Sequence, residues 1–428
     1  MTKRFIHVAD VHLDSPLAKV HRRDAKIGEQ MREASRRSFG SVVDLALERE
    51  VDAVVIAGDL FDGPIKDASA ALWVEGQFKR LTRSNIPVAL ILGNHDAISA
   101  SQKVTQWPNG VHEFGTSSAS TTVFEEAGLA VHGQSFGSRV QESDLAAKYP
   151  AAISGMFNVG LLHTSLSSPG SHDPYAPTTI SVLDAAGYDY WALGHIHLRS
   201  EQSQSESCYV GYSGNTQGRS VRETGAKGCQ VVEYSDDGLR HIEFVATDCF
   251  RWECLSLNIS NAERLGDIED LLVQQMGTLH QRADGRQLAV RIELEGTTAL
   301  HDSLTRLGAI DNLSEQLGDF LRASGDFWLE AVRLRSMPVP QAKHQDLVTS
   351  LDYLSRIAES SKKEGLLRGE LESSLEELLK KARGELSEYG WAIEFEPESE
   401  STDAVRLDQL LAQAENMLVS RLLGEAEA

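Results

Sequence analysis

The sequence predicts an α/β protein with a smaller α+β domain and a helical C-terminal region. Over residues 1–250, short apolar strands alternate with charged helical stretches. Continuous apolar runs of this kind are typical of strands buried on both faces of a sheet. Residues 251–340 show a second, shorter alternation of strands and helices, and residues 341–428 are rich in charge, with leucines at helical spacing.

The first region begins with three apolar runs, which predict strands at 5–9, 53–57 and 87–92. Charged stretches between them predict helices over 32–49 and 68–82. Further apolar runs predict strands at 129–132, 159–162, 188–193, 208–212, 230–234 and 241–245. A helix is expected from Pro177 to Ala186, because proline favours a helix start and Gly187 a helix end.

The second region is expected to contain strands at 253–259, 287–294 and 328–336, with helices over 262–275 and 299–323. Two prolines between Met337 and Pro340 indicate a linker. Beyond it, helices are expected over 345–389 and 404–423, separated by an acidic break. The predicted domains are therefore 1–250, 251–340 and 341–428.

Composition excludes several classes of protein. The 428 residues are 41% hydrophobic and 24% charged, which excludes long disordered and fibrous chains. No apolar run approaches the length of a transmembrane helix, and the basic start meets a charged residue too soon for a secretory signal. Four cysteines without a CxxC pair do not form a disulfide framework, so we expect a cytoplasmic protein.

The net charge of −22, from 41 basic and 63 acidic residues, argues against a protein that simply coats DNA. It does not exclude an enzyme that reaches a phosphate backbone through bound metal ions or through a basic partner.

Side chains of metal-ligand type follow five of the expected strands, where each strand ends. They are Asp10 and His12, Asp59, Asn94, His163, and His195 with His197. In an open α/β sheet the functional crevice lies outside the carboxyl ends of the strands, so we expect these side chains to converge. Glycines beside them, such as Gly58 and Gly93, allow sharp turns and close approach to an ion.

The residue types fit divalent cations. Carboxylate, imidazole and amide oxygen donors suit Mn, Fe or Zn, with no thiolate in the set. Seven ligands are too many for one tetrahedral zinc and fit two metals with waters. Two divalent ions, two carboxylates and one hydroxide leave a charge of about +1, which suits a phosphodiester anion.

The ordered pattern DxH, GDxxD, GNHD, H and GHxH, complete between Asp10 and His197, resembles that of the calcineurin-like metallophosphoesterase superfamily. The resemblance covers about residues 1–250 and implies a four-layer α/β/β/α sandwich. Within the superfamily the chain looks like the SbcD-type DNA repair exonuclease branch, especially its YhaO-like group. The stretches HVADVHLDSPL, AGDLFDG and 212–228 carry this likeness. It implies a capping domain over 251–340.

The resemblance also implies roles for the site residues. Asp10, His12 and His197 would hold one metal. Asn94, His163 and His195 would hold the other. Asp59 would bridge the two ions, with Mn²⁺ the expected metal. His95 would contact the phosphate and help to protonate the leaving oxygen, while a hydroxide between the metals attacks phosphorus in line. Asp62 and Asp96 are expected to orient histidines or cap loops.

Two further residues are candidates for substrate binding. Arg219 flanks a glycine-rich turn and His172 lies in a loop on the expected side of the site. The alternative for both is an ordinary loop side chain exposed to solvent.

The main functional hypothesis is a two-metal phosphodiesterase that acts on DNA as an exonuclease or endonuclease. One alternative is a small-molecule phosphoesterase acting on nucleotides or cyclic nucleotides, and another is a non-catalytic scaffold on the same fold. SbcD-type nucleases dock an ATPase coiled coil through C-terminal helices. The resemblance therefore implies an SbcC-like or AAA-type ATPase partner, or a homodimer, at 341–428; the alternative is packing within the chain.

Overall fold

The computed structural model describes residues 2–15, 25–63, 68–98, 106–166, 175–203 and 208–339. The helices expected beyond residue 340, and His172, lie outside the described residues. The chain divides into two compact units. The first contains residues up to 256 together with 271–293 and 311–333, and the second contains 257–270, 294–310 and the described residues from 334 on.

The first sheet has the strand order β12-β11-β1-β2-β3-β4. Strands β1, β2, β3 and β4 run parallel to one another, and β11 and β12 extend the sheet as antiparallel strands beyond β1. Their bounds are β1 Lys3–Val8, β2 Ala53–Ala57, β3 Val88–Ile91, β4 Val111–Glu113, β11 Gly228–Ser235 and β12 Gly238–Ala246.

The second sheet has the order β5-β6-β7-β8-β10-β9, with β6, β7, β8 and β10 parallel. Its strands are β5 Ser120–Phe124, β6 Leu129–Gly133, β7 Phe157–His163, β8 Tyr190–Gly194, β9 Ser200–Glu201 and β10 Tyr209–Tyr212. Because β2, β3 and β8 are buried along their whole length, their residues are continuously apolar rather than alternating.

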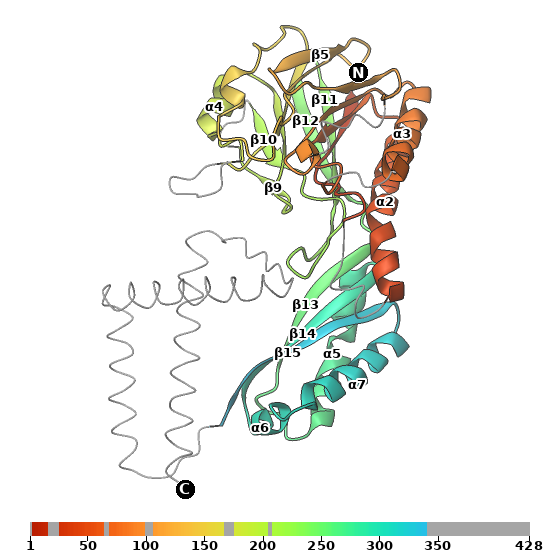
Figure 1. Ribbon diagram of the computed structural model, residues 1–428, viewed down its shortest axis with the longest axis vertical. Helices are drawn as coiled ribbons and strands as arrows, with labels where there is room; N and C mark the ends of the chain where they lie inside the picture. The colour runs from red at the N-terminus through yellow and green to blue at the C-terminus, as the bar shows by residue number, and fades with distance from the viewer. Residues whose placement is uncertain are drawn as a thin grey trace, which may run out of the picture. The chain divides into compact units, whose positions relative to one another are not determined.

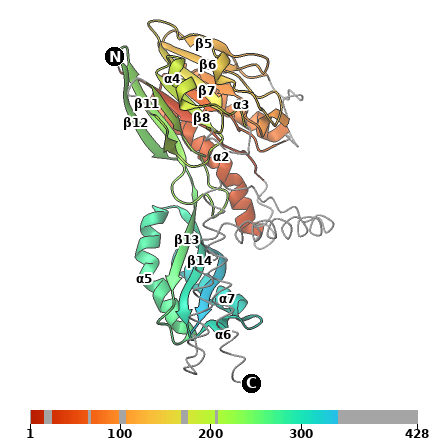
Figure 2. The ribbon, with the colours of Figure 1, turned by 90° about the vertical axis from the view of Figure 1, so that its left-hand side faces the viewer.

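The two sheets pack face to face. Phe5 and Val55 of the first sheet share an apolar core with Leu129 and Tyr190 of the second. On the outer face of the first sheet, helices α2 (Ala25–Glu48) and α3 (Ala68–Arg83) cover a second core that contains Phe39 and Phe78. Helix α4 (Ile180–Ala185) covers the outer face of the second sheet through Leu183 and Trp191 (Figure 1, Figure 2). The expected α/β/β/α sandwich is thus confirmed.

A three-stranded sheet follows, in the order β13-β14-β15. Its strands are β13 Phe250–Asn258, β14 Gln287–Thr298 and β15 Phe327–Pro338, and its helices are α5 Leu265–Ala283, α6 His301–Leu304 and α7 Ala309–Ala323. Within the first unit, Phe250 and Trp252 of β13 pack with Ala34 of α2 and Trp328 of β15. Two short 3-10 helices span Asp96–Ile98 and Ala146–Lys148.

Most expected elements form within a few residues of their expected bounds. Strands β4, β5 and β9 were not expected from the sequence. None of them is fully buried, and β9 has only two residues, so none produces a clear apolar pattern. Among the described residues, no helix combines the length and the apolar character needed to cross a membrane.

Candidate metal centre

Five strand ends meet at one place between the two sheets. Asp10 and His12 follow β1, Asp59 follows β2, and Asn94 and His95 follow β3; His163 ends β7, and His195 and His197 follow β8. Four of these residues have left-handed backbone conformations, namely Asp10 (φ 52°), His12 (φ 45°), Asp59 (φ 51°) and His195 (φ 96°). Non-glycine residues rarely adopt such angles, and they cluster where function requires a strained backbone.

Two of the expected glycines leave space for the site. A Cβ atom on Gly58, whose φ is +93°, would lie 2.5 Å from Nδ1 of His163. A Cβ atom on Gly93 would lie 2.2 Å from Oδ1 of Asp59. Any larger residue would therefore displace a site side chain, which is the physical reason for glycine at both strand ends.

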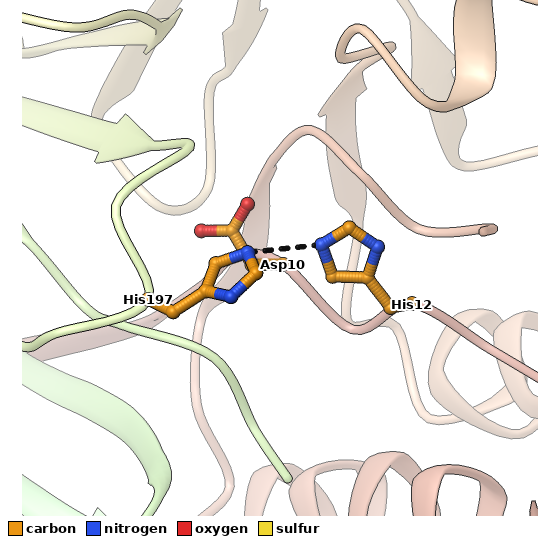
Figure 3. Close-up of side chains that lie close together, drawn as sticks. All are labelled: Asp10, His12 and His197. Atoms are coloured by element: carbon orange, nitrogen blue, oxygen red, sulfur yellow. Dashed lines mark hydrogen bonds between the residues drawn. The ribbon is translucent and has the colours of Figure 1, made fainter. Parts of the chain in front are cut away.

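The first cluster consists of Asp10, His12 and His197, whose ligand atoms all lie within 4.8 Å of one another. Figure 3 shows the imidazoles of His12 and His197 facing each other, with the carboxylate of Asp10 beside them. Their Nε2 atoms are 3.1 Å apart.

The outer nitrogens of the same two imidazoles face carboxylates. Nδ1 of His12 lies 3.3 Å from Oδ1 of Asp62, and Nδ1 of His197 lies 2.8 Å from Oε1 of Glu223. A carboxylate holds the proton on the nitrogen that faces it, so in each neutral ring Nε2 carries a lone pair. Two lone pairs that face each other at this distance are suited to share a cation, and the cluster therefore fits a metal ion.

The second cluster contains Asp10, Asp59 and His163, again within 4.8 Å of one another. Nδ1 of His163 donates to the carbonyl of Ala57 (3.0 Å), so Nε2 is the free nitrogen. Nε2 lies 2.8 Å from Oδ1 of Asn94 and 3.4 Å from Oδ2 of Asp59. Three acceptors thus converge, which again fits a cation.

Asp59 stands between the two clusters. Its Oδ2 atom lies 3.6 Å from Nε2 of His12 and 3.4 Å from Nε2 of His163. The backbone N–H of His195 donates to both oxygens of Asp10 (3.0 Å each), and the His195 ring lies 5.2 Å from the His163 ring, measured between centroids. The structure therefore brings together all seven side chains proposed as ligands.

His95 and the two remaining aspartates lie at the edge of these clusters. Nδ1 of His95 is 2.8 Å from Oδ1 of Asp62, and its side chain is 33% exposed, so it faces the solvent side of the site. Asp96 accepts hydrogen bonds from the backbone N–H groups of Leu60, Phe61 and Gly93. It thereby joins the loops after β2 and β3.

Burial and charge set the protonation of the cluster. Burial lowers the pKa of His12 and of His195 to about 3, so both rings are neutral and able to bind a cation at neutral pH. Burial also acts to lower the pKa of His163, but the nearby charge of Asp59 outweighs it and raises that pKa to about 9. The negative charge of Asp59 that stabilises a proton on His163 would also stabilise a metal ion bound to His163 in place of that proton.

Two residues near the site were missed by the sequence reasoning. Glu223 contacts His197 as described, and the Tyr175 ring lies 4.6 Å from the His195 ring, measured between centroids. Neither belongs to a strand-end motif, although Glu223 lies in the stretch 212–228 that carries the YhaO-like resemblance. Arg219 is brought to the site: its Nη1 atom lies 3.8 Å from Oδ1 of Asp62, and its Nη2 atom lies 3.3 Å from Oε1 of Glu223.

Comparisons with known proteins agree with this arrangement. Residues 3–199 match the family model described as calcineurin-like phosphoesterase, and residues 252–337 match the model for the middle domain of metallophosphoesterase YhaO. The chain is 32% identical over 316 residues to the uncharacterized metallophosphoesterase YhaO of Bacillus subtilis, covering 73% of this chain and 76% of that protein.

More distant relatives are named as DNA double-strand break repair proteins. The chain is 25% identical over 270 residues to the DNA double-strand break repair protein Mre11 of Methanopyrus kandleri, covering 58% of each protein. It is 22% identical to Mre11 of Sulfolobus acidocaldarius, covering 89% of this chain and 99% of that protein. Among solved structures, a dimetal phosphatase from Danio rerio aligns with a TM-score of 0.34 and 14% identity, covering 57% of this chain and 99% of that chain.

Proposed function

Because the chain belongs to the calcineurin-like phosphoesterase family and to its YhaO group, we propose that it is a two-metal phosphodiesterase that cleaves DNA. Membership of the family makes it a phosphoester hydrolase. One observation carries the two-metal proposal: the free Nε2 atoms of His12, His163 and His197 converge with the carboxylates of Asp10 and Asp59.

In this proposal Asp10, His12 and His197 hold one divalent ion, and Asn94, His163 and His195 hold the other. Asp59 lies between the two sets and serves both. Bound ions of this kind polarise the phosphate and lower the pKa of a coordinated water. The neutral imidazoles of His12 and His195 leave the site ready to bind cations at neutral pH.

His95 supplies the proton for the leaving oxygen. Its hydrogen bond to the Asp62 carboxylate raises its pKa, so the ring is charged over a wider pH range than a free histidine. The ring is partly exposed beside His12, with 4.8 Å between the ring centroids. A protonated His95 can therefore reach a phosphate bound next to the clusters and act as a general acid.

Arg219 is proposed to contact the substrate phosphate. Its guanidinium lies between Asp62 and Glu223, and its side chain is 24% exposed. A partly exposed guanidinium at the edge of a metal site is suited to a phosphate oxygen. His172, the other residue proposed for substrate binding, lies outside the described residues.

DNA is the proposed substrate because the Mre11 relatives are named as DNA double-strand break repair proteins. One of them aligns over 89% of this chain. The proposed division is a nuclease domain over 1–250, a capping domain over 251–340 and a helical region over 341–428 that binds an ATPase-type partner or a second copy of the chain. The match of the YhaO middle-domain model to 252–337 supports the capping segment.

The experiment compares labelled single- and double-stranded DNA with bis-p-nitrophenyl phosphate and with nucleotides, using the full-length protein with Mn²⁺, Mg²⁺ or Zn²⁺. Cleavage of DNA that disappears in a His95→Ala variant would support the nuclease. Cleavage of nucleotides alone would favour the small-molecule phosphoesterase. Metal binding without hydrolysis of any substrate would favour the scaffold.

A further inference from the structure

The loop between β10 and β11, residues 213–227, contacts His197 from the side opposite the proposed metal. We propose that Glu223, carried by this loop, is a positioning residue that fixes the orientation of the His197 ring and holds its proton on Nδ1. The inference rests on the proposed metal site, and it assigns to Glu223 a role that no motif of the site contains.

The carboxylate of Glu223 is itself held in place. Its Oε1 atom lies 2.8 Å from Nδ1 of His197. Nη2 of Arg219 lies 3.1 Å from the same nitrogen and 3.3 Å from Oε1, so the guanidinium can donate to the carboxylate while Nδ1 of His197 donates to Oε1, which can only accept. Its Oε2 atom accepts hydrogen bonds from the backbone N–H of Arg219 (2.7 Å) and from Nδ2 of Asn215 (2.8 Å). Because two donors hold Oε2, the carboxylate cannot rotate away, and Oε1 stays directed at His197. The side chain is only 13% exposed, so water competes little for these contacts.

The same loop also holds the backbone of His197. The carbonyl of His197 accepts from Nζ of Lys227 at 3.1 Å and from the backbone N–H of Asn215 at 3.4 Å. Gly214 permits this approach, because a Cβ atom there would lie 2.9 Å from that carbonyl oxygen. His197 is therefore fixed at both its ring and its backbone by one loop.

The loop in turn is anchored on β13. The indole Nε1 of Trp252 donates to the carbonyl of Gly218 (2.9 Å), and the N–H of Gly225 donates to the carbonyl of Trp252 (3.2 Å). Backbone N–H of Cys249 donates to Oε1 of Gln217 (3.1 Å). The loop is thus tied at several points along its length, which gives Glu223 a rigid support.

This support matters because the useful lone pair of His197 depends on it. With the proton held on Nδ1, Nε2 faces Asp10 and His12 with its lone pair free. Without the carboxylate, the ring could turn or place its proton on Nε2, which would remove one ligand from the first cluster. Residues that orient a metal-binding histidine in this way typically contribute about 10- to 100-fold to metal affinity.

The test measures Mn²⁺ binding to the full-length protein by titration calorimetry, with the number of ions checked by elemental analysis. Glu223→Ala should bind one ion as the wild type does and the other about 10- to 100-fold more weakly. Glu223→Gln should lose less, because its amide oxygen can still accept from Nδ1. Glu233→Ala is the matched control. It removes the ion pair between Glu233 of β11 and Arg4 of β1 (2.7 Å), and the variant protein should bind both metal ions normally.

Thermal unfolding of each metal-free variant reports whether it is folded. If the Glu223→Ala protein is unfolded, the Glu223→Gln protein is used for the metal titration instead. Wild-type affinity for both ions in the Glu223 variants would overturn the inference, as would an equal loss of both ions. A wild-type protein that binds no pair of ions would instead overturn the proposed function on which the inference rests.

Discussion

Oδ1 of Asp62 lies 2.8 Å from Nδ1 of His95 and 3.3 Å from Nδ1 of His12. One carboxylate oxygen therefore orients both the proposed general acid and a proposed metal ligand. The consequences for the two rings are opposite: the pKa of His95 is raised by its hydrogen bond to Asp62, whereas burial lowers the pKa of His12 to about 3. At neutral pH one ring is suited to carry a proton and the other to bind a cation.

His95→Gln is expected to lose about 100- to 10,000-fold in kcat, the usual contribution of a general acid, while still binding two ions. Asp59→Asn should lose metal as well, because it removes the negative charge between the clusters. The measurement pairs hydrolysis of bis-p-nitrophenyl phosphate with elemental analysis. Loss of metal from the His95 variant would show that its assigned role is wrong.

Activity is expected to depend on added divalent metal, with Mn²⁺ a good activator and Mg²⁺ a poorer one. The reason is the donor set, in which imidazole nitrogens outnumber carboxylates and Mg²⁺ prefers oxygen ligands. The check is to dialyse the protein against EDTA and then add back each ion in turn. Full activity after such dialysis would refute a metal-dependent reaction.

The stability of the metal-free protein should fall in mild acid, in part through His7. Its Nε2 atom lies 3.2 Å from the carbonyl of Leu193, and burial lowers its pKa to about 4. The unfolded chain, with a histidine pKa of about 6.5, binds the proton more tightly. The contribution is therefore complete above pH 6.5 and is lost as the pH falls from 6.5 toward 4.

Between pH 7 and pH 4.5 this loss amounts to about 2–3 kcal/mol in the free energy of unfolding. Urea unfolding in EDTA of the wild type and of His7→Gln measures it, because the variant lacks the titrating ring. The advantage of the wild type over the variant should shrink by that amount at the lower pH. An identical pH dependence in both proteins would contradict the prediction.

Deleting residues 341–428 is expected to spare hydrolysis of a small chromogenic diester, because all seven proposed ligands lie between Asp10 and His197. The deletion should impair processing of long DNA, through loss of an ATPase-type partner or of a second copy of the chain. The truncated and full-length proteins are compared on both substrates, with and without a co-purified partner. Equal losses on both substrates would mean that the deleted segment belongs to the folded core.

The sequence predicted most of the strands and the meeting of strand ends because both depend on local patterns, whereas the arrangement in two sheets was implied by the family resemblance. Runs such as Ala53–Ala57 are continuously apolar, and polar ligand-type residues follow directly where the strands end. Glu223 was missed for a physical reason. It lies 26 positions from His197, and their contact depends on how the loop after β10 returns toward β11. No periodicity encodes that path.

The pairing of β1 has a consequence for how the chain is made. β1 lies between β2 and β11, and Ile6 is paired with Val231 of β11. Contacts between such distant positions slow folding, because a long loop must close before they form. During synthesis, β1 keeps one unpaired edge until Ser235 at the end of β11 has left the ribosome. Unpaired strand edges favour aggregation, so a nascent chain that stalls before this point exposes an unpaired edge of β1, an interior strand of the finished sheet, and is expected to be prone to aggregation.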